Sequence, residues 1–142
     1  DFAFGGFDKI GQFLDRLVCK NIHIVLGNHD QHITKNREDI KDRFLSVSKY
    51  LEVNIDGVDF VLSHYPHASW NKLGKGSIHL HGHVHLSAKD KWGKGKRLDV
   101  GMDGNGYFPY KITEIVHMMD RREIRSEMDL DHHLDNLVGV VG

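Results

Sequence analysis

Residues 50–66 read Tyr-Leu-Glu-Val-Asn-Ile-Asp-Gly-Val-Asp-Phe-Val-Leu-Ser-His-Tyr-Pro, and they carry the strongest hairpin signal in the chain. Two runs rich in β-branched and aromatic residues, 50–55 and 58–63, flank Asp56-Gly57. A type I′ turn needs a positive φ at both central residues, and Asp-Gly is one of the pairs that provide it most readily. The stretch therefore predicts a β-hairpin whose second strand is closed by Pro66.

Around this hairpin, short apolar runs alternate with helical patterns, which is typical of an α/β protein. Helical spacing of apolar residues predicts helices over 8–20 (with Asp8 as the N-cap), 37–48 and 112–120. Further strands are expected at 22–26, 78–80 and 98–102. We expect a core domain over residues 1–125, with a polar, glycine-containing loop at 86–96, and a C-terminal helical tail over 126–142.

Composition limits the classes of protein to consider. The chain has 142 residues, 39% of them hydrophobic and 27% charged, which suits one soluble globular domain. The formal net charge of −1 favours neither nucleic acid nor an anionic membrane as a partner. One cysteine, Cys19, excludes an internal disulfide framework. The twelve histidines are far more than a chain of this length usually carries, and histidine is the commonest metal ligand.

The histidines gather where predicted strands end. The run 22–26 is followed by Gly27-Asn28-His29-Asp30, the run 58–63 by His64, and the run 78–80 by a segment that includes Gly82, His83 and His85. Ligand sites in open α/β sheets form just outside the carboxyl ends of strands. These three ends are therefore expected to meet around one crevice.

This set of side chains indicates a metal site. His83 and His85 are spaced i and i+2, so on an extended backbone both point the same way. Imidazole, amide oxygen and carboxylate together suit Mn²⁺, Fe, Zn²⁺, Ni²⁺ or Co²⁺ better than Ca²⁺ or Mg²⁺. Asp1 is a candidate for the carboxylate. The strip of His79 and His81 precedes the Gly82 turn, and we interpret these two as structural residues within the sheet.

The ordered set Gly27-Asn28-His29-Asp30, Ser63-His64 and Gly82-His83-Val84-His85 resembles the motifs of the calcineurin-like metallophosphoesterases. The resemblance covers roughly residues 1–115, and Asp1 looks like the aspartate of that family's Gly-Asp motif. It implies the family's αββα sandwich with mixed sheets, here without its first strand. It also implies a binuclear metal centre with two divalent transition metals per intact site, with Mn²⁺ the leading candidate.

The resemblance assigns ligands residue by residue. Asp1 would bridge the two metals, and Asn28, His64 and His83 would complete one of them. The other would take Asp1, His85, and an Asp and a His from an Asp-x-His motif that this sequence lacks and that would lie upstream. An intact site of this kind holds two metals, whereas this chain, without the Asp-x-His ligands, would hold as few as one. His29 is the implied catalytic acid, Asp30 is expected to orient it, and Tyr65 and His67 are weaker candidates for contacts with substrate.

The function expected from this resemblance is metal-dependent hydrolysis of a phosphodiester or a small nucleotide-like phosphate ester by a metal-activated water. A phosphomonoesterase or protein phosphatase of the same family is an alternative, and so is a catalytically impaired metal-binding module. Pairing of two chains through an exposed sheet edge is a further hypothesis. A basic loop between Lys89 and Arg97 leaves nucleic acid open as a partner without indicating it. No membrane association is expected, and a cytoplasmic location fits the single cysteine.

Overall fold

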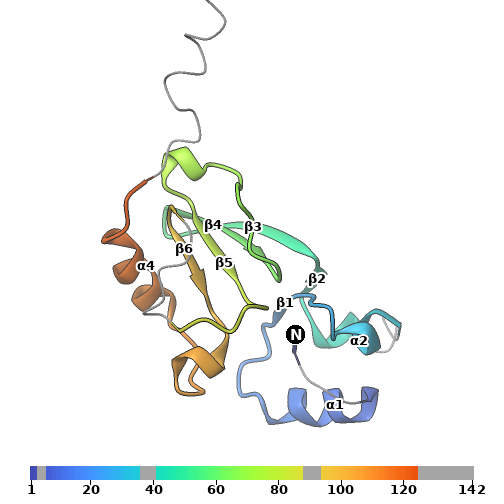
Figure 1. Cartoon of the computed structure of the whole chain (residues 1–142). Coiled ribbons are helices and arrows are strands. Elements are labelled where there is room, and N and C mark those ends of the chain that lie inside the picture. The colour runs from blue at the N-terminus through green and yellow to red at the C-terminus, as the bar shows by residue number, and fades with distance from the viewer. Residues whose placement is uncertain (3–5, 36–40, 88–93, 125–142) are drawn as a thin grey trace, which may run out of the picture.

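The computed structural model describes residues 1–2, 6–35, 41–87 and 94–124, which form a mixed α/β arrangement with two sheets (Figure 1). The elements follow one another as α1 (Phe7–Arg16), β1 (His23–Val25), α2 (Gln31–Lys35), β2 (Ser46–Ser48), β3 (Tyr50–Ile55), β4 (Val58–Ser63), β5 (Ile78–His81), β6 (Arg97–Asp99) and α4 (Ile112–Asp120). Single 3₁₀ turns lie at Lys41–Arg43, Leu73–Lys75 and Met102–Asn105.

The larger sheet has four strands in the order β3-β4-β5-β6. The β3–β4 pair is the hairpin expected from the sequence, in the register Tyr50 to Ser63 and Ile55 to Val58. Asp56 and Gly57 both have positive φ, 51° and 84°, as a type I′ turn requires. Strands β4, β5 and β6 run parallel, so their carboxyl ends lie at the same end of the sheet.

One face of this sheet is covered by α4, which lies along it in Figure 1. Alternate residues of the strands, among them Phe60, Ile78 and Leu80, pack against Ile115 and Met119 of the helix in one hydrophobic cluster. Each of these five side chains is buried. The helix was expected at 112–120 and is found there, because its apolar stripe matches the apolar face of the strands.

The opposite face of the sheet carries a smaller cluster of Val61, Trp70 and Leu73. His79 lies in β5 between Ile78 and Leu80, and it too is fully buried. Its ring lies 5.1 Å from that of Trp70, and the guanidinium of Arg97 lies 5.0 Å from the Trp70 ring. The alternation of a strand thus separates the apolar residues that meet α4 from the histidines on the other face.

The second sheet consists of β1 and β2, which pair in parallel from His23 with Ser46 to Val25 with Ser48. A separate hydrophobic cluster supports it, formed by Ile10 and Leu14 of α1 with Ile24, Ile33 and Phe44. In Figure 1 this part of the molecule, with α1 and α2, lies beside the carboxyl end of β5.

Several expectations about the elements were wrong. The helix predicted over 37–48 is not formed in its described part, because 46–48 extend as β2 and bond to β1. The first helix ends at Arg16, and its N-cap is Gly6 with Asp8 in the first turn. The last strand ends at Asp99, and Met102 begins a 3₁₀ turn. The expected tail over 126–142 and most of the basic loop lie outside the described residues.

No helix among the described residues combines the length and apolar character that a membrane crossing needs.

Candidate metal centre

The start of the chain is bound to the turn that follows β1. The Asp30 carboxylate accepts hydrogen bonds from the backbone N–H groups of Gly27 and Phe2, each at 2.7 Å. The Asp1 carboxylate accepts one from the backbone N–H of His29 at 2.9 Å. Asp30 is only 2% exposed, so its charge depends on these donors. The sequence suggested that Asp30 orients the His29 ring; its described hydrogen bonds hold the backbone around Asp1.

Gly27 makes this arrangement possible. A Cβ atom at this position would lie 2.0 Å from Oδ1 of Asp1 and 2.6 Å from its backbone nitrogen. Any other residue would therefore push Asp1 away from the turn. The glycine is required here by close approach.

Four side chains converge where the two sheets meet. Nε2 of His64 lies 2.8 Å from Oδ1 of Asn28, 3.1 Å from Nδ1 of His83 and 3.5 Å from Oδ2 of Asp1. Asn28 follows β1 of the small sheet, whereas His64 and His83 follow β4 and β5 of the large one. The backbone also joins the last two strand ends, since Gly82 N–H donates to the His64 carbonyl at 3.1 Å.

The electrostatics of the cluster favour a neutral His64. Burial, the nearby amino terminus and the His83 imidazole together lower the pKa of His64 to about 4, although the Asp30 carboxylate opposes this shift. The ring therefore keeps a nitrogen lone pair at neutral pH, which is the form that binds a metal ion.

The donor set fits a transition-metal ion in chemistry and spacing. Ligand atoms held roughly 2.0–2.2 Å from one metal lie about 3 Å from each other, comparable to the separations around His64. Among the described residues, however, no group of three or more His, Cys, Asp or Glu side chains has the geometry of a formed metal site.

The expected extended backbone through His83 and His85 is not observed. Both residues have positive φ, 70° and 54°, and Val84 N–H bonds back to the Gly82 carbonyl at 2.8 Å. The i, i+2 argument for a shared direction therefore fails. Non-glycine residues in this region are strained, and such strain is concentrated at functional sites.

No described contact joins His85 to the four converging side chains. Its Nδ1 is 2.5 Å from Oδ2 of Asp103, and its side chain is 72% exposed. Hydrogen bonding to His85 lowers the pKa of Asp103. Asp103 was not singled out from the sequence, and only its position soon after a strand end marks it.

The remaining candidates are placed as follows. His29 is exposed beside Asn28, and its backbone holds Asp1. Tyr65 borders the cluster, with its ring 5.0 Å from that of His64 and 4.7 Å from that of His83. The ring of His67 packs against His79 at 5.3 Å instead, and no described contact joins it to the four converging residues.

His79 and His81 lie within β5, as expected, and both are buried. Nδ1 of His79 lies 3.0 Å from the Val61 carbonyl oxygen. Nε2 of the same ring accepts a hydrogen bond from the backbone N–H of His67 at 3.0 Å. These partners fix the neutral tautomer with the proton on Nδ1. Nδ1 of His81 lies 3.0 Å from the Gly82 carbonyl, and burial lowers the pKa of His81.

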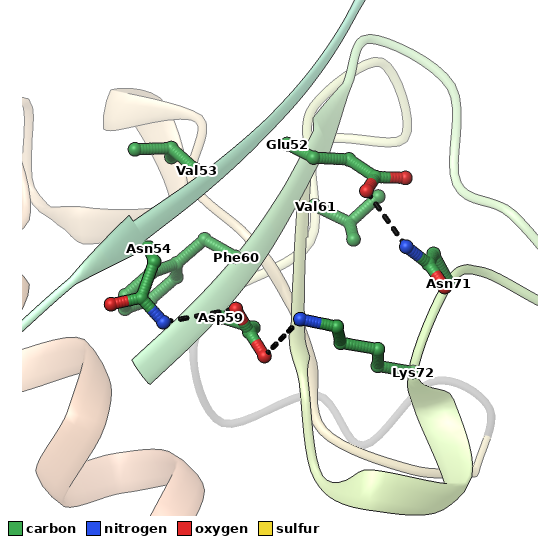
Figure 2. Close-up of a pocket in the computed structure, with 8 residues that line it drawn as sticks. All are labelled: Glu52, Val53, Asn54, Asp59, Phe60, Val61, Asn71 and Lys72. Atoms are coloured by element: carbon green, nitrogen blue, oxygen red, sulfur yellow. Dashed lines mark hydrogen bonds and ion pairs between the residues drawn. The ribbon is translucent and has the colours of Figure 1, made fainter. Parts of the chain in front are cut away.

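A pocket of about 190 Å³ lies elsewhere, beside the hairpin and away from the strand ends (Figure 2). Asp59 accepts hydrogen bonds from Asn54 and Lys72 at 2.9 and 2.8 Å, and Glu52 accepts one from Asn71 at 2.8 Å. Both carboxylates that line the pocket are thus hydrogen-bonded within the protein, Glu52 also accepting from the Tyr50 hydroxyl at 2.6 Å.

Comparison with known proteins adds information on the fold alone. No family model and no curated protein matches the chain. Its fold is similar to the crystal structure of the protein of unknown function AQ665 from Aquifex aeolicus, with a TM-score of 0.57 and 21% sequence identity. The match covers 82% of this chain and 70% of that one.

Proposed function

We propose that this chain is a metal-dependent phosphoesterase of the calcineurin-like type, with its metal ligands at the junction of the two sheets. The finer fold that goes with this proposal is the family's αββα sandwich. The substrate would be a phosphodiester or a small nucleotide-like phosphate ester.

One observation carries the proposal. Asn28 Oδ1, His83 Nδ1 and Asp1 Oδ2 surround Nε2 of His64 at 2.8–3.5 Å, although the four residues come from three strand ends and the start of the chain. Convergence of an amide, a carboxylate and two imidazoles from distant segments is typical of a transition-metal site. The order of these residues in the sequence also matches the motifs of the resembled family.

The chain's own residues would hold the ion and the substrate. Asp1, Asn28, His64 and His83 are the proposed ligands of one metal, and His85 with Asp1 would contribute to a second. Bound divalent metals would neutralise the phosphate charge and activate a water molecule for in-line attack. His29 is exposed beside Asn28, and its proposed role is to give a proton to the leaving alkoxide.

The test is hydrolysis of a bis-aryl phosphate by the purified chain with and without Mn²⁺. We expect activity only with added metal, and a fall of at least tenfold in both His83→Ala and His29→Ala. The matched control is His117→Ala, because His117 is exposed on α4 and is not one of the proposed metal ligands. Circular dichroism of every variant checks that the chain is folded.

A non-catalytic metal-binding module is the second candidate, and the structure gives it one specific support. His85 bonds to Asp103, and no described contact joins it to the cluster around His64, so its part in a second metal site has no support from the described contacts. Titration calorimetry with Mn²⁺ separates the candidates. Binding that His83→Ala removes, in a folded chain that hydrolyses nothing, would support the module and contradict the enzyme.

A further inference from the structure

The loop that follows β6 presents large apolar side chains to solvent. Tyr107 is 80% exposed, Phe108 72% and Met102 53%, and the 3₁₀ turn Met102–Asn105 buries none of its residues. Aromatic side chains of this size normally contribute to a core, so two adjacent ones left outside it call for a function.

This aromatic loop, residues 101–108, holds a defined shape through its own hydrogen bonds. Tyr107 N–H donates to the Met102 carbonyl at 2.7 Å, and Phe108 N–H to the Asn105 carbonyl at 3.2 Å. The Asn105 amide donates to the Phe108 carbonyl at 2.9 Å. Tyr107 also has a φ of 66°, which is unfavourable for a bulky residue. The loop therefore holds Tyr107 in an energetically unfavourable backbone conformation.

The loop is seated on the segment that carries His83 and His85. Asp103 lies 2.5 Å from Nδ1 of His85. Gly104 packs so closely that a Cβ there would lie 2.4 Å from the Leu86 carbonyl oxygen. In Figure 1 this orange segment lies at the same end of the large sheet as the carboxyl end of β5. The aromatic loop is therefore held against His85 and Leu86, which follow the candidate ligand His83 in the chain.

We propose that Tyr107 and Phe108 form a stacking platform for the nucleobase of a nucleotide whose phosphate lies at the metal centre. The inference rests on the proposed function for the phosphate half of the ligand. Stacking on exposed aromatic rings suits a base because every base has a flat π face, and it needs no buried polar groups. A rigid loop loses little conformational entropy on binding, which favours stacking on it.

The experiment compares binding of AMP, ribose 5-phosphate and adenosine to the folded full chain in Mn²⁺ by titration calorimetry. Ribose 5-phosphate carries a hydroxyl group where AMP carries adenine, so the ratio of their Kd values reports the contribution of the base. We expect AMP to bind about tenfold more tightly, the size of effect typical of one stacked base.

The variant is the double substitution Tyr107→Gly with Phe108→Ala. Glycine adopts a φ of 66° without strain, so the loop keeps its shape while both rings are removed. We expect the variant to bind AMP and ribose 5-phosphate equally, with the affinity for ribose 5-phosphate unchanged. Phe13→Ala is the control, because Phe13 is 44% exposed on α1 and is not part of the loop.

The outcomes separate the platform from the proposed function. Equal affinity of the wild-type chain for AMP and ribose 5-phosphate, an AMP preference that survives in the double variant, or no binding of any of the three would overturn the platform. A base preference that the double variant loses, together with affinities that His83→Ala leaves unchanged, would support the platform and contradict the metal centre. In that case, adenosine binding that is lost in the double variant would show that the base binds to the two rings without any contribution from the phosphate.

Discussion

Among single residues, the buried imidazole of His79 ties the stability of the fold to pH. Its ring is fully buried, with Val61 and His67 as hydrogen-bond partners for its two nitrogens. Burial lowers the pKa of His79 to about 4, although the bond to Val61 opposes this shift. A second proton would have to displace the His67 N–H from Nε2. The native state therefore takes up this proton at a lower pH than the unfolded chain does.

This difference predicts acid sensitivity. Between pH 6.5 and about 4 the unfolded chain binds a proton at this position and the native chain does not, so stability falls as the pH falls through this window. Below pH 4 the free energy of unfolding should be lower by about 3 kcal/mol than at neutral pH because of this one group. Urea unfolding across this range, for the wild-type chain and His79→Gln, measures it. The stability advantage of wild type should shrink at acid pH; a constant difference would contradict the argument.

Gly27 gives a second prediction at this scale. Gly27→Ala should displace Asp1, because a Cβ would lie 2.0 Å from its Oδ1. If Asp1 is a metal ligand, Mn²⁺ affinity should fall at least tenfold, as titration calorimetry would report. Gly11→Ala is the matched control. Nothing lies within 4 Å of a Cβ at Gly11, and alanine there should stabilise α1 by roughly 0.5–1 kcal/mol. Unchanged Mn²⁺ affinity in Gly27→Ala would remove Asp1 from the ligand set.

Sequence reasoning reached part of the site at this scale. It selected Asp1, Asn28, His64 and His83, which the structure brings together, because each follows a strand end or begins the chain. It misjudged the conformation of His83 and His85, since a positive φ in a non-glycine residue leaves no mark in the sequence. The contacts of Asp30 with the backbone of Gly27 and Phe2 were also missed, because a close approach of two chain segments leaves no mark in the sequence either.

At the scale of elements, the hairpin of β3 and β4 shows how a local signal can fix a structure. Asp56-Gly57 and the flanking runs predicted both strands with their observed bounds, because turn type and register are set within a few residues. The segment 37–48 shows the opposite case. Its apolar residues fit a helix, yet Ser46–Ser48 bond to β1, and only this long-range pairing decides between the two structures.

The turn itself can be tested. Gly57 has a φ of 84°, so Gly57→Ala should destabilise the chain by about 1 kcal/mol. No atom lies within 4 Å of a Cβ at this position, so the loss would come from the backbone alone. Thermal unfolding measures the effect, and Gly57→Asn should recover part of it because asparagine tolerates a positive φ. Equal stability of the alanine variant and wild type would contradict the type I′ turn.

At the scale of the whole molecule, the candidate metal centre lies between two parts with separate hydrophobic clusters. An ion held by Asn28 on one side and His64 and His83 on the other would bind only the folded chain. We therefore expect Mn²⁺ to raise the Tm of wild type by an amount that grows with its concentration. Differential scanning calorimetry should show no such shift in His83→Ala. A shift of the same size in that variant would place the ion elsewhere.

The two separate clusters also bear on how the molecule opens. The described apolar side chains of α1 and β1 pack in one cluster, and those of β4, β5 and α4 pack in another. Each part is therefore stabilised against local unfolding by its own hydrophobic contacts. Amide protons of β1 and of β5 should then exchange with solvent as two populations with different protection. Contacts from His64 to Asn28 and Asp1 join the two at their shared boundary. Ligation there would merge two local opening reactions into one, so that a chemical site would also set the cooperativity of the fold.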